Sequence, residues 1–71
     1  MNRLGEKLRI LRMRQGLTIR QLAPKLGVSD SYITQMELGK KTPSAKLVVK
    51  MSLFFQVPLD QLMRDDLELD S

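Results

Sequence analysis

Four polar side chains are spaced so that they share one face of a short helix. Asp30, Ser31, Thr34 and Gln35 stand at relative positions i, i+1, i+4 and i+5, and Ser29 precedes them. Their hydroxyl, amide and carboxylate groups can donate and accept hydrogen bonds in a fixed pattern. Such a face can recognise the polar edge of a partner molecule, or it can simply be covered by water.

The chain lacks most of the residue types that catalysis and metal binding usually require. It contains no histidine and no cysteine, so the commonest catalytic base, the thiol nucleophile and the usual nitrogen and sulfur metal ligands are missing. The carboxylates are scattered along the sequence. We therefore expect no enzyme active site, no metal site, no cofactor and no small-molecule ligand.

The charge distribution favours a polyanionic partner. The 71 residues include 12 basic and 8 acidic side chains, a net charge of +4. Four of the acids fall in the last seven residues, so residues 1–64 carry 12 bases against four acids, a net of +8. A surplus of this size indicates a polyanion, although a soluble basic surface remains the alternative.

The length allows one hydrophobic core. We expect the domain to occupy residues 1–64 and an acidic, frayed tail to occupy residues 65–71. No apolar run is long enough to span a membrane, and the first residues lead into no signal sequence, so a cytoplasmic protein is expected.

The elements that position the polar residues are predicted to be helices, because apolar residues recur at helical spacing and strand-like alternation is absent. The expected helices cover about residues 2–15, 18–26, 29–38 and 45–55, with a short fifth helix after Pro58 whose inward residues are Leu59, Leu62 and Met63. Thr18 and Gln21 have the spacing of a capping box, and Ser29 and Ser44 are further N-cap candidates.

Pro24 lies inside the second predicted helix, close to its end at Gly27. Proline removes a backbone N–H and disfavours helical geometry at the residue before it. Since Pro24 faces away from Leu22 and Leu26, we expect the helix to survive with a kink or a tightened last turn. Only Gly27 and Val28 then separate the second and third helices, which is the helix-turn-helix pattern.

The stretch LTIRQLAPKLGVSDSYITQMELGKKTPS, Leu17 to Ser44, resembles the Cro/repressor-type (XRE-type) helix-turn-helix proteins, and the resemblance extends over about residues 4–63. It is specific because several residues stand at the family's spacing: Ala23, Gly27, Val28, Ile33, Glu37, Gly39 and Pro43. The resemblance implies an all-α, compact five-helix domain of the lambda-repressor-like type. It also implies a sequence-specific regulator of transcription that binds double-stranded DNA, such as a repressor or a small controller protein.

In the family the third helix lies in the major groove. The resemblance therefore implies that Ser29, Asp30, Ser31, Thr34 and Gln35 face base edges. Gln35 can pair with adenine, whereas Asp30 can accept from cytosine or repel phosphates. Phosphate contacts are expected from Thr18, Ile19, Arg20, Gln21, Tyr32, Lys40 and Lys41. Ile19 and Leu38 depart from the family, in which these positions often carry glutamine and a basic residue.

Two further sets of residues follow from the resemblance. Arg12 and Glu37 match an ion pair that ties the first helix to the third. Family members usually bind near-palindromic DNA as dimers, so a homodimer is expected here, and its seam is predicted at Leu53, Leu59, Met63 and Leu67.

Two other functional classes stay open at this point. The fold can serve as a protein-interaction module that docks through Leu53 and the acidic tail. An enzyme is the third class, for which the sequence offers no credible site.

Overall fold

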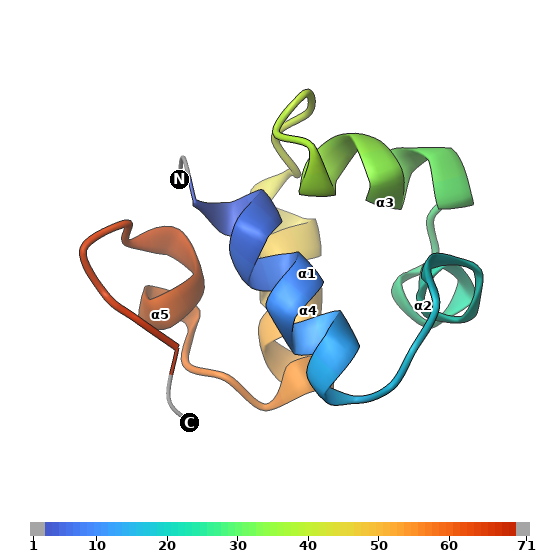
Figure 1. The fold of residues 1–71 in the computed structure, drawn as a ribbon. Helices are drawn as coiled ribbons and strands as arrows, with labels where there is room; N and C mark the ends of the chain where they lie inside the picture. Colours follow the sequence, from blue (N-terminus) through green and yellow to red (C-terminus); the bar gives the residue numbers. More distant parts are fainter. Residues whose placement is uncertain (1–2, 70–71) are drawn as a thin grey trace.

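Helix α1 lies in front of α4 in the centre of the molecule, with α3 and α2 on one side and α5 on the other (Figure 1). This computed structural model describes residues 3–69, across which the chain forms five helices and no strand. They are α1 (Leu4–Arg14), α2 (Ile19–Leu26), α3 (Asp30–Glu37), α4 (Ala45–Phe55) and α5 (Leu59–Met63). The predicted all-α, five-helix fold is confirmed. No helix in residues 3–69 has the length and apolar character needed to cross a bilayer.

Side-chain caps fix where the helices begin. The N–H of Gln21 donates to the Thr18 hydroxyl at 3.1 Å, and the N–H of Thr18 donates to Gln21 Oε1 at 2.9 Å. Both bonds of the predicted capping box are therefore present. Ser29 and Ser44 cap α3 and α4 in the same way, each accepting from the N–H three residues further on.

Helix α2 continues through Pro24 as predicted. The proline ring lies on the exposed face, and the N–H of Gly27 donates to the Pro24 carbonyl at 3.2 Å, a bond that tightens the last turn. Gly27 has a φ of 71°, which glycine adopts without steric cost. The N–H of Val28 then donates to the Ala23 carbonyl at 3.0 Å, which closes a Schellman motif. This turn sets the direction in which α3 leaves α2.

The core is built from one apolar face of each helix. Its buried residues are Leu4, Leu8, Leu11, Leu22, Ala23, Leu26, Ile33, Met36, Leu47, Val48, Met51, Phe55 and Leu62. In α5 only Leu62 is fully buried, while Leu59 packs partly against the core. The expectation that Met63 faces inward is wrong, because its side chain is 38% exposed. The predicted start of the first helix at Asn2 lies outside the described residues.

Gly5 allows α1 and α3 to approach closely. A Cβ atom at this position would overlap the backbone carbonyl oxygen of Met36. Backbone cannot move aside as a flexible side chain can, so only glycine fits. The end of α3 is therefore held directly against the first turn of α1.

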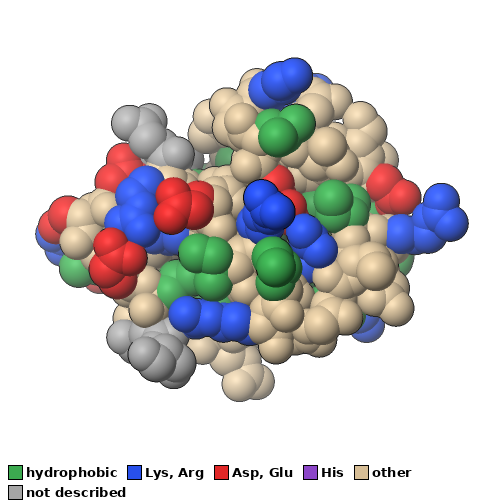
Figure 2. Space-filling view, viewed as in Figure 1, with side chains coloured by type: hydrophobic (Ala, Val, Ile, Leu, Met, Phe, Trp, Pro, Cys, Tyr) green, Lys and Arg blue, Asp and Glu red, His purple; other side chains and the backbone are tan. Residues whose placement is uncertain are grey.

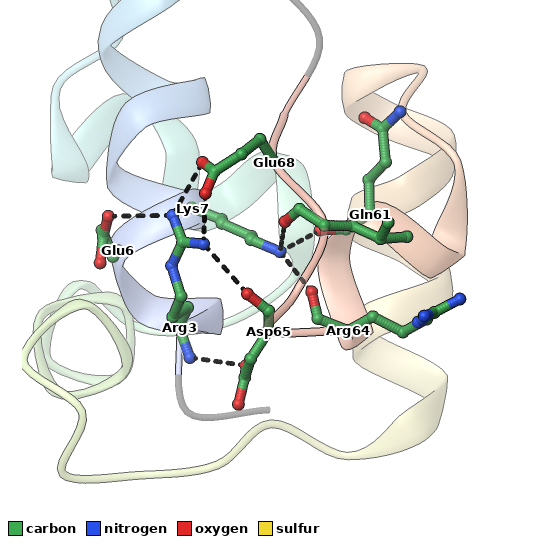
Figure 3. Close-up of polar contacts among 8 residues, drawn as sticks. Arg3, Glu6, Lys7, Gln61, Arg64, Asp65 and Glu68 are labelled. Carbon is green, nitrogen blue, oxygen red and sulfur yellow. Dashed lines mark hydrogen bonds and ion pairs between the residues drawn. The ribbon is translucent and has the colours of Figure 1, made fainter.

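The segment that follows α5 folds back onto α1 (Figure 3). The Nζ of Lys7 is buried and donates to the carbonyls of Gln61, Arg64 and Leu67 at 2.5, 2.7 and 2.7 Å. Arg3 binds the same segment through the Glu68 carboxylate, at 2.7 Å for the shorter of two hydrogen bonds. The prediction of a frayed acidic tail is thus wrong for residues 65–69, because carbonyls at the end of α5 and just beyond it need donors and Lys7 supplies them.

Candidate nucleic-acid interface

The exposed face of α3 carries an internal hydrogen-bond pattern. Gln35 Nε2 donates to the Ser31 hydroxyl oxygen at 3.0 Å, and the Thr34 hydroxyl donates to the Asp30 carbonyl at 3.1 Å. The Gln35 amide keeps its oxygen and one N–H for a partner, and Ser31 keeps its hydroxyl proton. The side chains of this face are therefore partly ordered before any ligand binds.

Ser29 has a different position from the other predicted base-reading residues. Its hydroxyl oxygen accepts from the N–H of Tyr32 at 3.1 Å and so stabilises the start of α3. Its proton and its second lone pair remain for other partners. The remaining four residues of the set lie on the outer side of α3, with Asp30, Ser31 and Thr34 exposed and Gln35 half-buried.

Asp30 meets a basic residue of α2. Its Oδ2 lies 3.7 Å from Nε of Arg20, and both side chains are largely exposed. Figure 2 shows an acidic and a basic side chain next to each other at the edge of the molecule where α2 meets α3. An exposed pair of this length is worth at most about 1 kcal/mol, so it orients the groups more than it stabilises the fold.

The start of α2 offers backbone donors. The side chains of Thr18 and Gln21 are taken up by the capping box, and Ile19 packs partly against the core. The first N–H groups of a helix have no acceptor within it, and the helix dipole favours an anion at that end. The N–H groups of Ile19 and Arg20 are thus the groups at this end that can bind a phosphate.

A second basic site lies after α3. Lys40 and Lys41 are exposed, and Nζ of Lys41 lies 5.6 Å from the centre of the Tyr32 ring. A cation–π contact of this kind holds the lysine over the start of α3. The predicted phosphate-binding residues therefore fall into two groups, one at each side of the exposed α3 face.

Arg12 and Glu37 are placed together between α1 and α3. Arg12 donates to the carboxylate through Nε at 2.8 Å and Nη2 at 3.1 Å, and its Nη1 donates to the Leu17 carbonyl at 2.9 Å. The hydrogen bonds from Arg12 to this carboxylate raise the pKa of the guanidinium above its ordinary value. The pair fixes the end of α3 relative to α1.

The residues predicted for a dimer seam differ in exposure. Leu53 on α4 is 74% exposed and Met63 is 38% exposed. Leu59 packs partly against its own core, and Leu67 is half-buried in the segment that returns to α1. Leu53 and Met63 are therefore the members of this set with the most apolar surface available for a second copy.

Charge is segregated over the surface. Acidic side chains gather over α5 and the beginning of α1 (Figure 2), where Glu6 and Glu68 surround Arg3. The hydrogen bonds from Arg3 hold the pKa of Glu68 below its usual value. Apart from Asp30 and Glu37 of α3, the acids of the described residues lie on α1, on α5 and in the segment that follows α5.

Two structural residues were missed from the sequence. Lys7 stands three residues after Leu4 and four before Leu11, on the apolar stripe of α1, and this position is the signal that could have found it. Gly5 gave no such signal, because a glycine inside a helix is only interpretable once the neighbouring backbone is known.

The sequence is similar to known regulators. Residues 8–62 match the Helix-turn-helix family. The chain is 36% identical over 62 residues to the transcriptional regulator ClgR of Mycobacterium tuberculosis, covering 87% of this chain and 55% of that protein. It is 40% identical over 60 residues to the HTH-type transcriptional regulator SlrR of Bacillus subtilis, covering 83% and 40% respectively.

A third relative is close to this chain in size. An uncharacterised HTH-type transcriptional regulator of Methanocaldococcus jannaschii is 43% identical over 59 residues, covering 83% of this chain and 89% of that protein. The chain spans about half the length of ClgR and less than half that of SlrR. With the match over residues 8–62 and the turn between α2 and α3, this chain belongs to the XRE-type helix-turn-helix family of DNA-binding transcriptional regulators.

Proposed function

We propose that this domain binds specific sequences in double-stranded DNA by laying α3 in the major groove, and that it thereby regulates transcription. The observation that carries the proposal is the outer face of α3, where Asp30, Ser31, Thr34 and Gln35 present polar groups beside a rigid, capped turn. A helix of this size fits the groove, and the side chains at its exposed N-terminal part reach base edges.

Affinity comes from the two groups of phosphate contacts on either side of α3. The backbone N–H groups of Ile19 and Arg20 hold a phosphate of one strand, and Lys40 and Lys41 hold the other, with the Tyr32 hydroxyl beside them. Each lysine that neutralises a phosphate releases condensed counterions, so binding weakens steeply with salt. These contacts set the register of α3 but read no sequence.

Gln35 reads adenine in this arrangement. Its bond to Ser31 fixes the plane of the amide while Oε1 and the second N–H stay available. Those two groups match N6 and N7 of adenine in the major groove. The Thr34 methyl group can meet a thymine methyl, since its hydroxyl is turned back toward the Asp30 carbonyl.

Two copies of the chain bind one site. A single short helix reads few base pairs, and two half-sites about one helical turn apart give the specificity that one lacks. Leu53 and Met63 supply the apolar surface of the seam. Repression is the form of regulation that occupancy alone produces, because a bound dimer excludes other proteins from the same stretch of DNA.

The alternative function, a protein-interaction module, is less well supported by the structure. It needs the acidic segment as a docking arm, but residues 65–69 are held on α1 by Lys7 and Arg3. The regulator is therefore the function that the geometry supports best.

Selection of preferred sites from random double-stranded DNA tests the proposal. We expect enrichment of a near-palindrome with an adenine in each half-site, and sedimentation should show two chains per enriched DNA. Gln35→Ala should relax the preference at that adenine while Lys25→Ala, an exposed change on α2 outside the proposed contacts, leaves it intact. If Gln35→Ala kept the preference for that adenine, the proposed placement of α3 in the groove would be wrong. A single chain on the DNA would refute the dimer.

A further inference from the structure

Arg20 and Asp30 form an open pair at the junction of the two helices. Arg20 stands in the first turn of α2 and Asp30 is the first residue of α3. The closest approach joins Nε of the arginine to Oδ2 of the carboxylate at 3.7 Å, with side-chain exposures of 91% and 54%. This distance is that of an ion pair and is too long for a hydrogen bond.

The other arginine–carboxylate pair on α3 is closed. Arg12 uses Nε and Nη2 on Glu37 and Nη1 on a carbonyl, and the two side chains are only 14% and 7% exposed. Its donors are consumed within the protein. Arg20 instead comes nearest to Asp30 through Nε, and its side chain is 91% exposed, so its terminal nitrogens are accessible to a partner.

A carboxylate at the start of a groove-binding helix needs a partner. Asp30 would enter a region surrounded by phosphates, where an unpaired negative charge that loses its water is costly. Paired with Arg20 it becomes part of a neutral unit. The same pairing draws the guanidinium toward α3. In the groove it would therefore lie nearer to the base edges than to the phosphate backbone.

We propose that Arg20 is a base-reading residue that Asp30 orients, and that the pair selects a guanine in each half-site. This inference rests on the proposed function and adds a specificity-determining residue to it. The guanidinium is a planar fork, and its two terminal nitrogens match O6 and N7 of guanine in the major groove. The backbone N–H of Arg20 still serves the phosphate, while its side chain reads the base.

Site selection with five proteins tests the proposal: the unaltered chain, Arg20→Lys, Asp30→Asn, the double variant of these two, and Lys25→Gln as an exposed control on the same helix. Arg20→Lys keeps the charge but loses the fork, and Asp30→Asn keeps the shape but loses the charge that orients the arginine. Both should weaken the preference for one guanine, by roughly 5- to 150-fold for the lysine variant. The double variant should lose no more than Arg20→Lys alone, and the control should match the unaltered chain.

A second measurement needs no altered protein. Replacing the selected guanine by 7-deazaguanine removes the N7 acceptor and leaves the base pair intact. The unaltered chain should lose affinity for this DNA. This arm decides the question even where a substitution disturbs folding.

Three results would overturn the inference. If Arg20→Lys leaves every base preference intact while Arg20→Ala only shallows the salt dependence, the side chain binds phosphate. If Asp30→Asn alters a position that Arg20→Lys does not, Asp30 reads cytosine itself. If the chain binds DNA with 7-deazaguanine as tightly as DNA with guanine, the guanidinium of Arg20 does not contact N7. If the unaltered chain enriched no sequence at all, the proposed function itself would be contradicted. Failure of the inference and failure of the proposed function can therefore be told apart.

Discussion

Arg12 of α1 donates two hydrogen bonds, of 2.8 and 3.1 Å, to the carboxylate of Glu37 at the end of α3. Both side chains are nearly buried, and Gly5 brings the backbones together just beside them. The position of α3 is thus set by contacts with α1 at the C-terminal end of α3.

The costs of breaking the two halves of this pair should not add. Arg12→Met and Glu37→Met each leave an uncompensated charge in a nearly buried place, at about 3 kcal/mol of unfolding free energy. The double variant should cost clearly less than the sum of the two. Denaturant unfolding of the four proteins of the cycle measures the coupling. Strictly additive costs would show that the two side chains do not act as a pair.

Gly5→Ala should destabilise the domain. In an ordinary helix interior this change stabilises by roughly 0.5–1 kcal/mol, because alanine has the better helix propensity. Here the new methyl group meets the Met36 carbonyl, and overpacking of this kind costs about 1–3 kcal/mol. The sign of the change in the thermal midpoint shows whether the gain in helix propensity or the cost of overpacking is larger. Arg9→Ala, on the exposed side of α1, is the control. A raised midpoint would contradict the close approach of α1 and α3.

Local signals in the sequence predicted the helices and the turn well. The capping box at Thr18, the serine caps and the glycine after Leu26 depend only on residues a few positions apart, so they can be recognised without the fold. Lys7, Gly5 and the return of residues 65–69 depend on backbone that is distant in sequence. The same holds for Asp30, whose neighbour Arg20 is ten residues away and becomes adjacent only when α2 and α3 have packed.

Lys7→Met should loosen the segment that follows α5. The variant keeps the apolar stem but leaves the carbonyls of Gln61, Arg64 and Leu67 without their donor. Hydrogen bonds from a charged donor such as these are worth about 1.5–3 kcal/mol each, against a total stability of only about 4–10 kcal/mol for a chain of this length. We expect a large fall in the thermal midpoint and faster amide exchange in residues 61–69. Lys25→Met, on the exposed side of α2, should change neither, and equal behaviour of the two variants would refute the role of Lys7.

The contact between Arg3 and Glu68 should open in acid. The hydrogen bonds from Arg3 lower the pKa of Glu68 in the folded protein. A lowered pKa means that the stabilisation is complete above the ordinary glutamate pKa of about 4.3 and is lost as the pH falls through the lower folded value. The NMR signals of residues 65–69 should shift over that range, and Glu68→Gln should remove this step. A step that persists in Glu68→Gln belongs to another carboxylate.

The salt dependence of DNA binding tests the central claim most directly. Fluorescence anisotropy with a labelled random duplex should show tight binding at low salt and a linear fall of log affinity with log salt concentration, with a slope set by the number of phosphates contacted. Lys41→Ala should shallow that slope by about 0.9. Arg64→Ala, whose side chain is held by Asp66 away from the α3 face, should leave it unchanged. Absence of binding at low salt, or equal slopes for Lys41→Ala and the unaltered chain, would contradict the placement of DNA on this surface.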